Sequence, residues 1–182
     1  GMGAQVTVMD RAPGVLRRID AQFGGRVRTL HASPEAIAAA LPLTDLVIGA
    51  VLVPGAAAPR LLTRAMLGLL PPGAVLVDIA IDQGGCFETS RPTTHSAPTY
   101  VEGGIVHYCV ANMPGAVART STLALTGVTR PFVERLADQG LDALRADPHL
   151  RAGLNVHAGR LTCAAVAQAQ QRDYVDAAEA LG

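Results

Sequence analysis

The residues best suited to chemistry lie in Asp82-Gln83-Gly84-Gly85, a polar, glycine-rich turn that follows the apolar run 73–81. Such a run is typical of a strand buried on both faces, and open α/β sheets bind ligands at the carboxyl ends of their strands. Asp82 therefore has two interpretations. It either faces a cofactor and substrate, or it is only a polar residue of a tight turn.

Two more turns follow apolar strands. Val51-Leu52-Val53-Pro54-Gly55 comes after the predicted strand 45–50, and Asn112-Met113-Pro114-Gly115 comes after 105–110. We expect all three turns at one edge of a sheet. Val51 to Gly55 could form an apolar wall for an adenine or a nicotinamide ribose, or it could be simply a turn. Asn112 could hold a carboxamide or a ribose hydroxyl, or it could form an Asx-type turn.

Asp10 ends the predicted strand 5–10. In dinucleotide-binding folds an acid there accepts hydrogen bonds from the adenosine ribose and repels a 2′-phosphate, which would favour NAD over NADP. The alternative is an ordinary helix cap. The usual companion of this acid, a Gly-x-Gly-x-x-Gly turn one strand earlier, is absent. We expect that strand and turn upstream of residue 1.

Other chemistries find less support in the sequence. Arg91, in the polar loop 91–95, could clamp a carboxylate or phosphate, or it could be a surface arginine. Ser121 lacks a Gly-x-Ser-x-Gly context, which argues against a hydrolase. We expect no metal, because metal-ligand spacing is missing among His31, His149 and His157.

The composition indicates which kinds of partner and which cellular compartment to expect. The 182 residues carry 15 basic and 15 acidic side chains and no Trp, so nucleic acid and anionic membrane surfaces are not expected partners. No apolar run approaches the roughly 18 residues that span a bilayer. Cys86, Cys109 and Cys163 lack CxxC spacing, which favours reduced thiols and a cytoplasmic location.

Strand and helix patterns alternate along the first part of the chain. We expect strands at 5–10, 26–30, 45–50, 73–81, 100–101 and 105–110. We expect three helices between these strands. The first begins after Asp10, and the second begins at the N-cap Ser33. The third has one apolar face, formed by Leu61, Leu62, Ala65, Met66 and Leu69. This order predicts an α/β fold, a Rossmann-like parallel sheet with helices on both faces that lacks its first strand and glycine-rich turn.

The pattern changes after Pro114. Helices are expected at 116–125, 131–139, 141–145 and 161–170 with no strand between them, followed by a fraying tail beyond residue 172. We therefore divide the chain into an incomplete NAD-binding domain, 1–115, and a C-terminal helical segment, 116–182.

Four contiguous stretches, at 48–55, 77–86, 91–95 and 107–122, closely resemble alanine dehydrogenase. The proton-translocating transhydrogenase α chain shares the fold, but its motifs fit less well. The resemblance covers most of this chain and corresponds to the downstream half of the family. It implies the NAD-dependent oxidative deamination of L-alanine to pyruvate and ammonium.

The resemblance also implies roles for individual residues. Asp82 matches the active-site aspartate of the family. The implied cofactor contacts are Asp10 at the adenosine ribose, Val51 and Leu52 along the cofactor, Ile79, Ala80, Ile81 and Asp82 beneath the nicotinamide ribose, Arg91, and Val110, Ala111, Asn112 and Met113 around the nicotinamide.

This sequence departs from the family pattern in several places. The family's catalytic His and its substrate-binding Lys and Arg lie upstream and are not in this sequence. Val15 stands where some members have a cation, and Gln139 where some have a metal-ligand His. The resemblance suggests hexamers, with the helices after residue 115 packed on an upstream substrate domain. The alternative is a non-catalytic nucleotide-binding fragment or a subunit of a split dehydrogenase or transhydrogenase.

Overall fold

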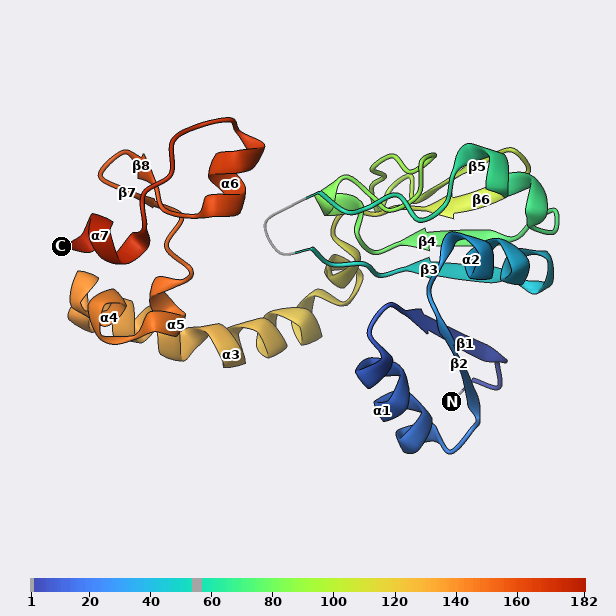
Figure 1. Ribbon diagram of the computed structural model, residues 1–182, viewed down its shortest axis with the longest axis horizontal. Helices are drawn as coiled ribbons and strands as arrows, with labels where there is room; N and C mark the ends of the chain where they lie inside the picture. Colours follow the sequence, from blue (N-terminus) through green and yellow to red (C-terminus); the bar gives the residue numbers. More distant parts are fainter. Residues whose placement is uncertain (1, 54–56) are drawn as a thin grey trace.

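The computed structural model describes residues 2–53 and 57–182, and its first unit is a parallel strand pair (Figure 1). Strands β1 (Val6–Asp10) and β2 (Val27–His31) are joined by helix α1 (Pro13–Phe23). Gly24 ends α1 in the left-handed region, at φ 56°. Helix α2 (Pro34–Ala40) begins as predicted at Ser33, whose Oγ accepts a hydrogen bond from the backbone N–H of Ala36.

The main sheet has four strands in the order β3-β4-β6-β5. These strands are β3 (Leu46–Gly49), β4 (Val75–Asp78), β5 (Thr99–Glu102) and β6 (Ile105–Tyr108). The first three in the spatial order, β3, β4 and β6, are parallel, and β5 is antiparallel to β6. The parallel-dominated α/β sheet predicted from the sequence is therefore confirmed, and the carboxyl ends of β3, β4 and β6 meet at one edge.

A single hydrophobic core supports this sheet. Its most buried members come from β4, β6 and the connections beside them, and they include Leu41, Leu62, Leu76, Phe87 and Ile105. The described residues of this half of the chain also form four short 3-10 helices: η1 (Leu41–Leu43), η2 (Arg64–Leu69), η3 (Ile81–Gln83) and η4 (Met113–Val117).

The helix predicted along Leu61 to Leu69 is wrong over its first half. Residues 58–62 run beside residues 83–88, and only η2 is helical. The backbone N–H of Ala58 donates to Gln83, and the N–H of Glu88 donates to Leu62. Because these long-range hydrogen bonds occupy the backbone groups, the segment does not close helical turns of its own.

The two helices predicted at 116–125 and 131–139 form one continuous helix, α3 (Ala118–Gln139), with Pro131 inside it. A proline removes one intrahelical hydrogen bond, to the carbonyl four residues earlier. That carbonyl belongs to Gly127, an exposed residue, so water can satisfy it and the helix continues. In Figure 1 α3 extends away from the sheet toward the last elements of the chain.

The segment beyond α3 is not entirely helical. Helices α4 (Leu141–Ala146) and α5 (Pro148–Arg151) are followed by the antiparallel pair β7 (Val156–His157) and β8 (Arg160–Leu161). The predicted helix 161–170 therefore begins only at α6 (Ala164–Ala169).

The predicted fraying of the tail is also wrong, because residues 177–181 form helix α7 (Ala177–Leu181). Asp176 caps this helix by accepting a hydrogen bond from the N–H of Ala178 at 2.8 Å. Leu181, at its end, is buried.

Candidate functional site

Asp82 lies in η3, which directly follows β4 at the carboxyl edge of the sheet. Its neighbour Ile81 is buried in the protein interior, whereas Asp82 itself is exposed. The turn thus presents a carboxylate to the space above the strand ends.

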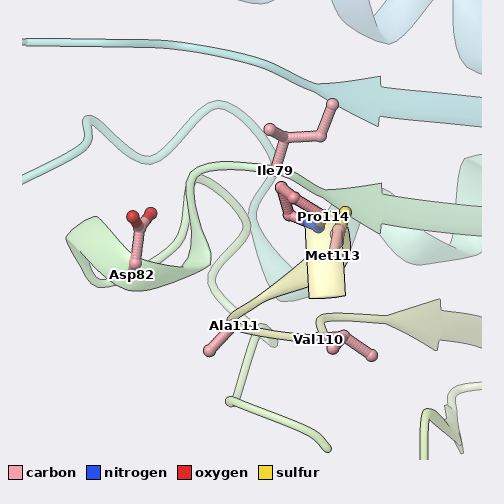
Figure 2. Close-up of a pocket in the computed structure, with 6 residues that line it drawn as sticks. All are labelled: Ile79, Asp82, Val110, Ala111, Met113 and Pro114. Carbon is pink, nitrogen blue, oxygen red and sulfur yellow. The ribbon is translucent and has the colours of Figure 1, made fainter. Parts of the chain in front are cut away.

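Two adjoining cavities, each of about 210 Å³, open at this edge. The first is lined by Ile79, Asp82, Val110, Ala111, Met113 and Pro114 (Figure 2). The second is lined by Ala50, Val51, Leu52, Ile79, Ala80, Asp82 and Gln83. Ile79 and Asp82 line both cavities, so the Asp82 carboxylate is part of two mostly apolar cavities. Apolar walls with a few placed polar groups are typical of sites for small molecules.

Large apolar side chains at these cavities are open to solvent. Ile79 is 52% exposed and Leu52 is 70% exposed. Apolar surface gathered at the functional edge of a sheet is a feature of ligand-binding grooves. A flat, partly apolar ligand lying over Ile79 would cover it.

Of the residues expected to contact a cofactor, eight line these cavities: Val51, Leu52, Ile79, Ala80, Asp82, Val110, Ala111 and Met113. Ile81 does not, because it is buried beneath the turn. The end of the predicted apolar wall, Pro54 and Gly55, lies outside the described residues.

Asp10 is at the carboxyl end of β1 and is not among the residues that line the two cavities. Its Oδ1 accepts a hydrogen bond of 2.7 Å from the backbone N–H of Ala12. This is an Asx-type turn ahead of α1 and not the helix cap that was the alternative, because the N-cap residue is Ala12 and it has no side-chain cap. Asp10 keeps a second carboxylate oxygen, so the turn and ribose binding are compatible.

Arg91 also lies outside the lining of the two cavities. Its guanidinium carbon stands 3.9 Å from the centre of the Tyr100 ring, and its backbone N–H donates to the Tyr100 hydroxyl. Burial raises the pKa of Tyr100 to about 12, so the ring stays a neutral phenol. A cation–π contact of this kind fixes the position of the arginine.

Asn112 is at the N-terminus of η4 and is held by a histidine that the sequence analysis did not single out. The Nε2 of His95 is 2.6 Å from the backbone carbonyl oxygen of Asn112 and donates to it. A side chain at Gly115 would place its Cβ 3.0 Å from Asn112 Nδ2 and 3.1 Å from His95 Nε2. Glycine therefore lets this loop pack closely beside the first cavity.

The sequence analysis also missed Asp78, the last residue of β4, which has no exposed surface. Its carboxylate accepts hydrogen bonds from the backbone on both sides of the Asp82 turn. The signal was present in the sequence. An acidic residue inside an apolar run is uncommon, and a buried acid must be paired or hydrogen-bonded.

Within the described ranges, 2–53 and 57–182, no group of three or more His, Cys, Asp or Glu side chains is arranged to hold a metal ion. Across the same ranges, no helix combines the length and the apolar character needed to cross a membrane.

Comparison with known proteins gives a consistent result. The family "Alanine dehydrogenase/PNT, C-terminal domain" matches residues 1–164. The alanine dehydrogenases of Halomonas elongata and Mycolicibacterium smegmatis are 60% and 55% identical over all of this chain, which covers 49% of each. The chain thus spans about half the length of these curated relatives.

Solved structures agree. An L-alanine dehydrogenase superposes with a TM-score of 0.82 at 48% identity, covering 93% of this chain and 47% of that one. A transhydrogenase from Sinorhizobium meliloti superposes with a TM-score of 0.69 at 26% identity, covering 90% of this chain and 43% of that one. The matching domain is the NAD(H)-binding domain of both enzymes, which confirms the NAD assignment for the family. The chain belongs to the alanine dehydrogenase/PNT C-terminal domain family.

Proposed function

We propose that this chain forms the cofactor-binding part of an NAD-dependent alanine dehydrogenase, with Asp82 at the active site. In the proposed reaction L-alanine, NAD⁺ and water give pyruvate, ammonium, NADH and a proton. The observation that carries the proposal is the exposed Asp82 carboxylate between two apolar cavities at the carboxyl edge of the sheet. Family membership supplies the reaction class.

The residues around the cavities fit a dinucleotide. Val51, Leu52 and Ala80 offer an apolar surface to one part of the cofactor, and Val110 and Met113 flank another. Asp10 would accept hydrogen bonds from the adenosine ribose, and Arg91 and Asn112 are further proposed contacts. The cofactor supplies the acceptor for the hydrogen that leaves the substrate carbon.

Asp82 contributes charge at the reacting carbon. Oxidation of an amine develops a cationic iminium, and an ionised carboxylate beside it stabilises that charge. The same oxygen atoms can orient the water that attacks the iminium and accept its proton. Because Asp82 lies in both cavity linings, one side chain can meet substrate and cofactor.

The arrangement of the chain supports a larger assembly. We propose that residues 1–115 bind NAD, and that residues 116–182 pack on a substrate-binding domain. Exposed apolar side chains along α3, including Leu125, Val128 and Phe132, give this segment surface to bury. We further propose a homo-oligomer, a hexamer by family resemblance. Because Cys86, Cys109 and Cys163 are free thiols, we propose a cytoplasmic location.

A second candidate is a nucleotide-binding module that is not catalytic alone, favoured by the two cavity linings, in which Asp82 is the single ionisable side chain among the described residues. Two measurements separate the candidates. Calorimetry should show that the 182-residue chain binds NADH more tightly than NADPH. L-alanine-dependent NADH formation should then be measured for a chimera of the first half of the Halomonas elongata enzyme and this chain, with L-serine and no-substrate controls.

Turnover by the chimera supports the dehydrogenase assignment. NADH binding without turnover in the chimera favours the non-catalytic module. Absence of NADH binding in both proteins would refute the cofactor assignment itself.

A further inference from the structure

Asp78 is a fully buried acid that lines neither of the two cavities. It ends β4 and lies opposite Gly49 of β3 in the parallel register. A buried carboxylate needs a cation or a set of hydrogen-bond donors. The ion pairs found among residues 2–53 and 57–182 all involve other acids, so the donors must come from neutral groups.

Five neutral donors surround this carboxylate. Oδ1 accepts from the N–H of Ala80 at 3.0 Å and from the thiol of Cys86 at 3.4 Å. Oδ2 accepts from the N–H of Cys86 at 2.8 Å, from the N–H of Phe87 at 3.4 Å, and from the hydroxyl of Ser90. Hydrogen bonds to an ionised acceptor are the stronger kind, and here three come from the main chain.

These donors lie on both sides of the Asp82 turn. Ala80 precedes η3, and Cys86 follows it, so one carboxylate ties together the two ends of the loop. On the far side Arg60 donates to the carbonyls of Gly85 at 3.2 Å and Phe87 at 2.6 Å. The loop is therefore fixed through its backbone as well as through the packing of buried side chains such as Ile81 and Cys86.

The glycine after the turn fits the same arrangement. Gly85 has φ +76°, and a Cβ there would lie 2.9 Å from Asp78 Oδ2 and 2.8 Å from Ser90 Cβ. A larger residue would push the carboxylate away from its donors. The absence of a side chain at Gly85 therefore leaves the space that the Asp78 carboxylate occupies.

We propose that Asp78 is a positioning residue that holds the loop 80–86 in the conformation that presents Asp82 and Ala80 to the cofactor. Its effect on cofactor binding rests on the proposed function above. Its effect on the loop does not, because the hydrogen bonds are internal to this chain. The two effects can be tested separately in one protein.

The first test is native-state amide exchange on the 182-residue chain and its Asp78→Asn variant. Asparagine keeps the shape but replaces one acceptor oxygen with an NH₂ group that faces other donors. Loss of hydrogen bonds to a charged acceptor predicts about 10- to 100-fold faster exchange at Ala80, Cys86 and Phe87. Amides within β4 should change less than about threefold, since the strand pairing is untouched.

The matched control is Leu41→Ala, which opens the same hydrophobic core at a position outside the loop. It lowers global stability, so its exchange rates should rise throughout the sheet. Unchanged exchange at Cys86 and Phe87 in Asp78→Asn would overturn the proposal. So would a rise there that matches the rise within β4.

The second test is NADH binding by the same variants. Asp78→Asn should weaken binding at least about tenfold, whereas Leu41→Ala should stay within about twofold at a temperature where both are folded. Equal weakening in both variants would overturn the positioning role in binding. If the unmodified chain does not bind NADH, the proposed function fails, and amide exchange alone decides whether Asp78 holds the loop.

A milder variant covers the case in which Asp78→Asn does not fold. Ser90→Ala removes one donor and leaves Oδ2 with the N–H groups of Cys86 and Phe87. Exchange at Cys86 and Phe87 should then be faster by about threefold to tenfold, with β4 unchanged. Unaltered exchange at both amides would count against the proposal.

Discussion

Gly49→Ala should destabilise this protein although the backbone at Gly49 has an ordinary φ. Gly49 ends β3, and an added Cβ would lie 2.7 Å from Phe87 Cζ and closer still to Cys86 Sγ. Phe87 is 1% exposed and Cys86 is 0% exposed, so neither side chain has free space to move into. The methyl group must displace packed core atoms or the strand itself.

The expected loss follows from this overlap. Overpacking a closed core costs about 1–3 kcal/mol. For a chain of this size each kcal/mol lowers the melting temperature by about 2–4 °C, so a decrease of roughly 2–12 °C is expected. Thermal unfolding followed by circular dichroism measures it. The matched control is Gly127→Ala in α3, where no atom lies within 4 Å of the new Cβ apart from the adjoining residues and the nearby helix backbone, so stability should rise by about 0.5–1 kcal/mol.

A double-mutant cycle tests the cause. Cys86→Ala removes the nearer obstacle, so it should recover part of the loss caused by Gly49→Ala, with a coupling of about 0.5–3 kcal/mol. Additive effects would show that the two positions do not compete for space. A melting temperature unchanged by Gly49→Ala would refute the packing argument outright.

Three further predictions concern the site, the sheet edges and the buried thiol. In the chimera Asp82→Asn should lower turnover by about 100-fold or more and change NADH affinity less than threefold; equal losses would make Asp82 a structural turn residue. Light scattering should show self-association of the isolated chain through unpaired strand edges, reduced by Ile48→Lys in β3, where Ile48 is 56% exposed; a clean monomer would contradict this. Burial, and to a smaller extent the Asp78 carboxylate, raise the pKa of Cys86 from 9.0 to about 12. The stability that the protonated thiol contributes should therefore be present in full below pH 9. It should fall between pH 9 and pH 12 by up to about 1.4 kcal/mol per pH unit. Chemical denaturation from pH 8 to 10 should show this slope, and Cys86→Ser should remove it.

The parallel sheet could be predicted because its strands are nearly all apolar. The runs 45–50 and 73–81 have no polar face, which is the pattern of strands covered on both sides. The alternation of strands with helices predicts parallel pairing. It holds for β1 and β2, which α1 connects, and also for β3 and β4, although the helix in the described part of their connection is the 3-10 helix η2. The position of Asp82 could be predicted as well, because it directly follows an apolar strand and ligands bind at the carboxyl ends of such strands.

Local periodicity failed where a long-range partner decides the conformation. Leu61, Leu62 and Met66 have helical spacing, and all three contribute to the core, yet residues 58–62 hydrogen-bond to residues 83–88. Both a helix and an extended segment can bury these side chains. The choice depends on a partner more than twenty residues away, which no short window of sequence contains.

Asp78 and Asp82 show a feature that the sequence did not determine, namely which of two nearby acids is buried and which is exposed. If β4 continued through residue 82, the side chains of residues 78 and 82 would lie on the same face of the sheet, because side chains along a strand alternate with a period of two. The strand ends at Asp78 instead, and its side chain accepts a hydrogen bond from the backbone N–H of Ala80. The chain then turns through η3, which leaves Asp78 buried and Asp82 exposed. The buried acid thus ends the strand that carries it, and by doing so it sets the direction of the acid that faces the cavities.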